Sequence, residues 1–309
     1  MKKKRQLLVL IPLVLTAALS CAYLFLYAAK RDESAPVIQI DNNILEVSVN
    51  YSQQDLVKGV SAWDEIEEDV TDKIVVESIS SLRKDHTASI VYAAFDANGN
   101  VSKASRVIKF IDYTEPHFYL HSPLLFITSN NQDVMSCIGA VDVVDGDISR
   151  KIKGNLVSDT STLSNAGVHR IEFRVSNSLG DTVYLTLPVD VFEPNEMNAS
   201  LNLKEYLIYL PKDSEFDPAE YLSSLAIGSS ELYLDGSDES VSVYTDSYGK
   251  YELTTENGEY IIDVDIDSNV NTNISGVYTV TYRAVMERGT TTYTGFTRLN
   301  VVVEEMSHE

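Results

Sequence analysis

The chain has 309 residues, with 24 lysine and arginine residues against 46 aspartate and glutamate residues, and a net charge of −22. Six of the basic residues lie in residues 1–31, so the remainder holds 18 basic residues and a net charge of −28. This balance argues against nucleic acid as a partner, because few basic residues are available to neutralise phosphates. The two cysteines, Cys21 and Cys137, fall on different sides of the expected domain boundaries, so no intramolecular disulfide is expected.

The N-terminus has the pattern of a membrane anchor. Residues 2–5 are all basic, and residues 7–29 carry no charge. As a helix this run is about 34 Å long, enough to cross a hydrocarbon core of roughly 30 Å. Basic residues before the span hold the N-terminus in the cytoplasm, so residues 1–31 are expected to be a cytoplasmic stub and signal anchor, with the C-terminal domains extracellular. A cleaved signal peptide, or lipidation of Cys21, stays open as an alternative.

Short strands are expected in the rest of the chain. Runs rich in valine, isoleucine and aromatic residues alternate with turns of aspartate, asparagine and glycine, and no long stretch has helical periodicity. In one run, Ile90, Tyr92 and Ala94 are expected to face between two sheets. The sequence therefore predicts an all-β protein. The clearest strands cover residues 89–95, 168–175, 183–192, 277–285 and 299–303.

An internal repeat divides this β region. Residues 62–74 align without a gap on residues 140–152, and residues 167–175 match residues 276–284. Each repeat is long enough for a β-sandwich of about seven short strands. A proline in each short junction predicts a stiff array. We expect three such domains, at residues 36–112, 113–193 and 194–306.

The second repeat carries the most specific pattern. Residues 142–149 place Asp142, Asp145 and Asp147 before Ile148 and a serine, and a Gly-Val-x-x-Ile-x-Phe-x-Val strand follows at residues 167–175. This pattern resembles the bacterial Ig-like repeats related to hyalin-repeat domains, which occur in tandem on Gram-positive surface proteins. The resemblance implies tandem Ig-like β-sandwiches with a spacer or adhesive role, and it supplies no catalytic residues.

The acidic segment of that repeat is a candidate metal site. Asp142, Asp145 and Asp147 would offer carboxylate oxygens to Ca²⁺, which takes six to eight oxygen ligands. No glutamate follows at the spacing of an EF-hand loop. The alternative is a turn in which the aspartates accept backbone N–H groups before a strand. Calcium is the only cofactor that the sequence indicates.

The third repeat differs from the others in composition and contains an insertion at residues 213–249. It holds 11 of the 18 tyrosines. Tyrosine gives a large contact area at a low entropic cost, which favours a partner-binding surface, although tyrosine also favours strands for structural reasons. Asp217 and Pro218 predict a short helix, as its N-cap and its first residue. The candidate contact residues are Tyr233, Tyr244, Tyr248 and Tyr251.

No Gly-x-Ser-x-Gly elbow, His-Glu-x-x-His pair or phosphate loop occurs in the sequence. We therefore expect a non-enzyme that is anchored in the cell membrane and acts as an extracellular spacer and adhesion module. Its third domain would present the binding surface to a protein or a cell-envelope glycan. A scaffold subunit of a membrane complex and a carbohydrate-binding module of the cell wall are the two alternatives.

Overall fold

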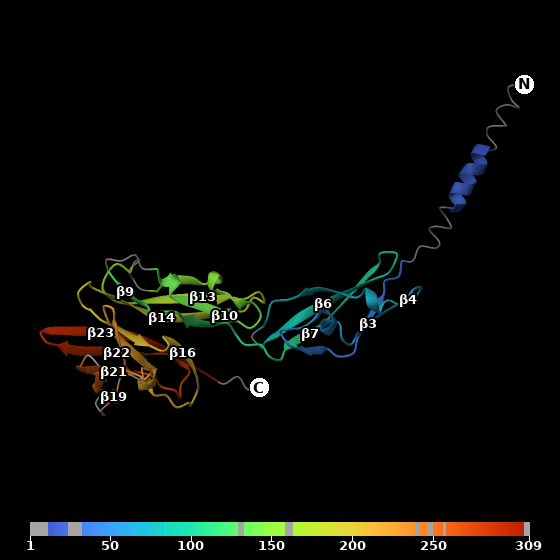
Figure 1. Cartoon of the computed structure of the whole chain (residues 1–309). Coiled ribbons are helices and arrows are strands. Elements are labelled where there is room, and N and C mark those ends of the chain that lie inside the picture. The colour runs from blue at the N-terminus through green and yellow to red at the C-terminus, as the bar shows by residue number, and fades with distance from the viewer. Residues whose placement is uncertain are drawn as a thin grey trace, which may run out of the picture. The chain divides into compact units, whose positions relative to one another are not determined.

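The computed structural model divides into two compact units, Met1–Tyr113 (unit 1) and Thr114–Glu309 (unit 2) (Figure 1). Beyond the N-terminal helix the chain forms strands β1 to β23 with short helical turns between them. The prediction of an all-β protein is confirmed. The structure describes residues 12–23, 33–83, 85–128, 133–157, 163–238, 242–245, 250–255 and 258–305.

Residues 12–23 are helical. In the described part of the chain, no helix is both long enough and apolar enough to span a bilayer. The expected span at residues 7–29 continues on both sides into residues outside the described ranges, namely 7–11 and 24–29. The membrane anchor therefore stays a prediction.

After the N-terminal helix, unit 1 forms two sheets that we call the first sandwich. Ala62, Val70 and Ala94 pack together between them. The connections include the short helices α2 (Gln53–Leu56) and η1 (Thr71–Lys73). The first sheet has the antiparallel order β1 (Val37–Ile40), β3 (Val60–Asp64), β4 (Glu68–Asp69). The second has the order β2 (Ile44–Val47), β7 (Val101–Phe110), β6 (Thr87–Phe95), β5 (Val75–Ile79), in which β2 and β7 are parallel.

The core of unit 1 contains a buried arginine. On β6, Ile90, Tyr92 and Ala94 are fully buried, as the alternation of the strand predicted. Arg106 of β7 is also buried and donates from Nε to the Tyr92 hydroxyl at 2.8 Å. Its Nη2 donates to two backbone carbonyls of the α2 segment, and the Tyr92 hydroxyl donates to one of them at 2.7 Å. These hydrogen bonds connect β7 to the α2 segment. None of the three acceptors is a carboxylate.

Unit 2 begins with a second sandwich whose strand order repeats that of the first. The short helices η2 (Val134–Ser136) and η3 (Ser149–Lys151) lie in its connections. One sheet has the order β8 (His117–Leu120), β10 (Ile138–Asp142), β11 (Gly146–Asp147). The other has the order β9 (Leu125–Ile127), β14 (Thr182–Phe192), β13 (Gly167–Ser176), β12 (Lys153–Leu156), and β9 is again parallel to its neighbour.

A third sandwich completes unit 2 with the same order and two extra strands. Its predicted helix after Asp217 is present as η4 (Pro218–Tyr221), and the Asp217 carboxylate accepts the N–H of Ala219 at 2.9 Å. The smaller sheet has the order β15 (Ser200–Leu203), β17 (Leu222–Ile227), β18 (Ser230–Tyr233). The larger has the order β16 (Leu207–Pro211), β23 (Thr291–Glu304), β22 (Gly276–Arg288), β21 (Gly258–Ser268), β20 (Lys250–Thr255), β19 (Ser242–Thr245).

The second and third sandwiches are joined by an ion pair. Asp190 of β14, only 4% exposed, accepts two hydrogen bonds of 2.8 Å from Nε and Nη2 of Arg298 on β23. Phe192, two residues after Asp190 on β14, packs against Phe296, two residues before Arg298 on β23. Their ring centroids lie 5.1 Å apart. Leu207 of β16 packs into the core of the second sandwich. These contacts fix the two sandwiches against each other.

A histidine lies at the same junction. The His117 ring packs against Tyr209 with 4.6 Å between ring centroids, and its Nε2 is 3.4 Å from Oε1 of Glu304. The Tyr209 hydroxyl accepts the N–H of Phe118 at 3.0 Å, and burial raises the pKa of Tyr209 to about 12. The hydrogen bond to Glu304 raises the pKa of His117 above its usual value, with burial acting in the opposite direction.

The His117 contact predicts a pH-dependent stability of unit 2. A raised folded-state pKa adds stability that is complete below the unfolded pKa, about 6.5, and that is lost as the pH rises through the folded value. The melting temperature of unit 2 is therefore expected to fall between about pH 6 and about pH 8 by more in the parent than in a His117→Gln variant. Thermal unfolding followed by circular dichroism measures this difference, and parallel pH profiles would contradict it.

Candidate functional site

The four candidate tyrosines do not form one surface. Tyr244 on β19 is 64% exposed, and Tyr233 on β18 is half-buried with its hydroxyl 3.2 Å from the Glu231 carboxylate. Tyr251 is only 6% exposed, because the alternation of β20 turns it inward with Leu253 into the core. The expectation that Tyr251 contacts a partner is therefore wrong. Tyr248 lies outside the described residues.

The three aspartates of the candidate calcium site hold their own loop together. Asp142 is buried, and its Oδ1 accepts the N–H groups of Val144 and Asp145. Asp145 accepts from Lys151 Nζ at 2.6 Å and from Ser178, while Asp147 accepts from the N–H and hydroxyl of Ser149. Within the described ranges, no three acidic, histidine or cysteine side chains are placed to hold a metal ion. The geometry thus corresponds to the hydrogen-bonded turn that was the alternative to calcium.

The same turn in the first sandwich has one unsatisfied atom. Oδ1 of Asp64 accepts the N–H groups of Ile66 and Glu67, as Asp142 does in the second sandwich. The other oxygen of Asp142 accepts from Nδ2 of Asn177 at 3.1 Å, but Oδ2 of Asp64 is buried with no hydrogen-bond partner among the described residues. At the position of Asn177 the first sandwich has Asp96, whose carboxylate can only accept hydrogen bonds and so cannot donate to Asp64.

Oδ2 of Asp96 accepts from Nδ2 of Asn100 at 2.6 Å, so both residues must be exchanged to give Asp64 a donor without setting two amide donors against each other. The variant Asp96→Asn/Asn100→Asp, which carries the pair that the second sandwich has at Asn177 and Asp181, is expected to stabilise unit 1 by about 1 kcal/mol, because the new amide can donate to Oδ2 of Asp64. The matched control, Asn177→Asp, should destabilise unit 2. Urea unfolding of both variants measures these changes, and a loss of stability in Asp96→Asn/Asn100→Asp would contradict the argument.

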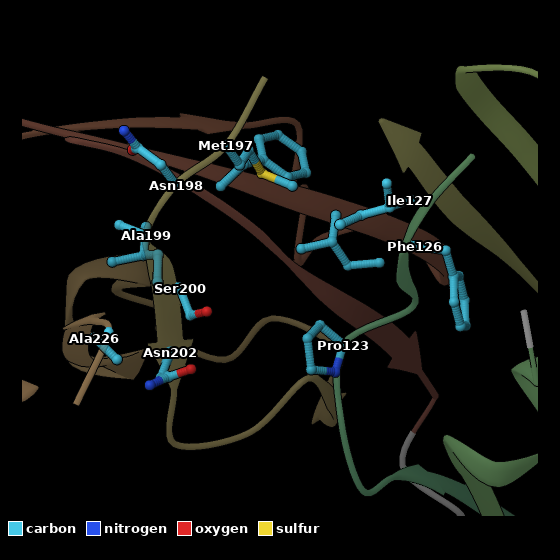
Figure 2. Close-up of a pocket in the computed structure, with 13 residues that line it drawn as sticks. Pro123, Phe126, Ile127, Met197, Asn198, Ala199, Ser200, Asn202 and Ala226 are labelled. Atoms are coloured by element: carbon cyan, nitrogen blue, oxygen red, sulfur yellow. The ribbon is translucent and has the colours of Figure 1, made fainter. Parts of the chain in front are cut away.

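Unit 2 contains a groove of about 480 Å³ between the second and third sandwiches (Figure 2). Figure 2 shows Pro123 and Ile127 on one side and the segment from Asn198 to Asn202 on the other. Phe296, 7% exposed and packed on Phe192, also lines the groove. The lining residues are Pro123, Leu125, Phe126, Ile127, Met197, Asn198, Ala199, Ser200, Leu201, Asn202, Ala226, Gly228 and Phe296.

Two edge strands border this groove. Among the described strands, β9 is the last of its four-stranded sheet and β15 the last of its three-stranded sheet. The N–H groups of Asn198 and Ala199, just before β15, donate to the carbonyl of Thr294 on β23 and are not available to an added strand. An edge strand presents backbone N–H and C=O groups that an added strand can pair with. An extended chain in the groove would meet such edges on both sides and apolar side chains between them.

A second concave surface of about 530 Å³ lies elsewhere on unit 2. It is formed by the outer face of β13 and β14 together with β22 and β23 of the third sandwich. Tyr184 is 57% exposed there, and Arg170 lies on the neighbouring strand. An exposed aromatic ring beside polar groups is a surface on which a sugar ring can stack.

No family model matches this chain. A protein of Acholeplasma phage L2, described as an uncharacterized 81.3 kDa protein, is 27% identical to it over 180 residues. The match covers 57% of this chain and 23% of the phage protein, so the chain spans less than a quarter of that relative.

Solved structures give only weak likenesses. The protocadherin GammaB4 extracellular domain is 12% identical, with 87% of this chain and 49% of that chain covered and a TM-score of 0.18. A structure of the M60 catalytic domain with two CBM51 domains from Clostridium perfringens ZmpB is 11% identical, with 87% and 43% covered and a TM-score of 0.24. At these TM-scores neither likeness carries an argument about this chain.

Proposed function

We propose that this chain is an exported, non-catalytic adhesion module in which unit 1 is a spacer and unit 2 binds an extended segment of a partner protein. The binding site is the groove between β9 and β15. The observation that carries this proposal is that two strand edges from different sheets border one apolar groove. The Ig-like resemblance of the repeats agrees with a spacer and adhesive role.

The groove lies where a binding surface can be held rigid. The Asp190–Arg298 pair and the Phe192–Phe296 contact fix the two sandwiches whose strands line it. A preformed groove loses little conformational entropy when a ligand enters, which favours binding. The basic residues 2–5 and the uncharged run at residues 7–29 support the further proposal that the chain is tethered to the cell membrane with both units outside.

Selection of a random peptide library on the full-length chain tests the groove. The expected binders carry apolar side chains at alternate positions, because only every second side chain of a strand faces the groove. A Ser200→Trp variant fills the groove from β15 and should weaken binding of the selected peptides by about tenfold or more.

The matched control is Ser230→Trp, which adds the same side chain at an exposed position of β18 in the same sheet. It should bind the selected peptides as the parent does. A library from which no peptide is enriched, or peptides that bind Ser200→Trp as tightly as the parent, would overturn the proposal.

Carbohydrate binding at Tyr184 is the second candidate, supported by the exposure of that ring in the larger concave surface. Retention of the chain on isolated cell wall that is lost in Tyr184→Ala and kept in Ser200→Trp would favour the glycan over the peptide. The opposite pattern would favour the peptide.

A further inference from the structure

A basic pocket of about 360 Å³ interrupts the acidic surface of unit 2. It is formed by η3, the start of β12 and the adjoining part of β13. Four of its six lining residues are basic, although acidic residues outnumber basic ones 46 to 24 in the chain. The lining residues are Arg150, Lys151, Ile152, Lys153, Arg174 and Ser176.

Three of the four cations have no carboxylate bound to them. Lys151 is paired with Asp145 at 2.6 Å. Arg150, Lys153 and Arg174 are exposed, and in the described part of the chain they form no ion pair. The pKa of Asp147 is lowered mainly by the Ser149 hydroxyl and to a smaller extent by the charge of Arg150. Glu172, two residues before Arg174 on the same face of β13, is a further acidic group on that strand.

Two of these cations are held side by side. Lys153 of β12 lies directly opposite Arg174 of β13 in the antiparallel ladder. Residues in such positions have Cβ atoms about 5 Å apart, and like charges there are destabilising unless something lies between them to offset the repulsion. A bound anion would remove that repulsion.

The fold does not require these basic residues. The first sandwich has the same ladder, and its residues at the corresponding register are Val75 and Ala93. Its residue at the place of Arg150 is Asp72. One copy of the repeat therefore builds the surface without a basic cluster, and the other builds it with three unpaired cations.

We propose that this pocket binds the phosphate group of a phosphorylated ligand. Arginine donates in a planar fork that fits two phosphate oxygens, and lysine adds a point charge. Phosphate carries up to two negative charges and so matches several cations better than a single carboxylate does. Tyr184 lies opposite Arg174 on β14, which gives the rest of the ligand an exposed ring to contact. This inference does not depend on the groove of β9 and β15.

Chemical footprinting of Lys153 in the full-length chain, held in a maltoside detergent, tests the proposal. Tripolyphosphate at millimolar concentration should slow acetylation of Lys153, read by mass spectrometry, by about tenfold. Lys109 of unit 1, which is also exposed, serves as the internal control. The variant R150D/R174A, which carries the residues of the first sandwich, should lose the protection. Lys58→Asp combined with Arg83→Ala makes the same change of net charge in unit 1 and should keep it.

A second arm identifies the source of the phosphate. Protection in nanodiscs containing phosphatidylglycerol, but not by tripolyphosphate, assigns the pocket to a lipid headgroup, and the reverse assigns it to a soluble phosphorylated ligand. Protection of Lys109 to the same extent as Lys153, persistence of protection in R150D/R174A, or no protection by either probe would overturn the proposal.

Discussion

Replacing Asp190 by alanine is expected to lower the free energy of unfolding of unit 2 by about 3–5 kcal/mol, because it leaves a buried charge without its partner. The Arg298 side chain is only 15% exposed, and among the described residues its two carboxylate contacts are both to Asp190. Without the carboxylate the guanidinium stays largely covered, over the Phe296 ring at 5.7 Å and at the edge of the second concave surface. Urea unfolding, with separate probes for the two units, measures the loss.

The control for this prediction replaces both partners. An Asp190→Leu/Arg298→Met variant removes the uncompensated charge and should recover much of the lost stability, since a buried ion pair is often equalled by apolar residues of similar volume. Unit 1 should unfold unchanged in both variants. A loss of less than about 1 kcal/mol in Asp190→Ala would show that the pair does not hold the two sandwiches together.

Replacing Arg106 by leucine is expected to destabilise unit 1 by about 3 kcal/mol, because the carbonyls of Leu56 and Lys58 and the buried Tyr92 hydroxyl lose a charged donor. Arg106 is 6% exposed and makes three hydrogen bonds to these groups, all 3.1 Å or shorter. The same denaturation experiment measures this change, and unit 2 should not respond.

The second sandwich supplies the control for Arg106. At the positions of Tyr92 and Arg106 it has Phe173 and Leu187, both fully buried. The double variant Tyr92→Phe/Arg106→Leu should therefore be less destabilised than the sum of the two single variants. Additive losses would show that the tyrosine and the arginine do not act as one network.

Strand positions were predictable from the sequence, because alternation of buried and exposed side chains is a local property. Residues 89–95 lie within β6 and residues 168–175 within β13, and the predicted buried residues of β6 are buried. The helix after Asp217 was predictable for the same reason, since an N-cap and a first-turn proline act within one turn.

The alignment of residues 62–74 on residues 140–152 also predicted that Glu68 and Gly146 occupy the same position of a turn, and the structure shows that they share a backbone conformation. Gly146 has a φ of +69°, and Glu68 occupies the same turn of the first sandwich with a φ of +66°. Glutamate adopts this left-handed conformation at some energetic cost, so the loop is held by its other contacts. Among these is the carboxylate of Asp64, which accepts two backbone N–H groups of the same turn.

The proposed binding surfaces were not predictable, because strands far apart in sequence form them. The groove joins β9 to β15, and the basic pocket depends on the register that sets Lys153 opposite Arg174. Composition indicated the tyrosines of the third repeat instead, but a count of tyrosines does not show which face of a strand each occupies. Tyr251 is in the core for that reason, while Tyr184, which composition did not single out, is exposed.

Hydrogen exchange of the full-length chain, with and without a peptide selected on it, tests the central claim most directly. The account predicts slower exchange at the backbone amides of β9 and β15, because an added strand pairs with their edges. Slower exchange confined to β19 around Tyr244, with β9 and β15 unchanged, would contradict it and would place partner binding on the tyrosine-rich part of the third sandwich.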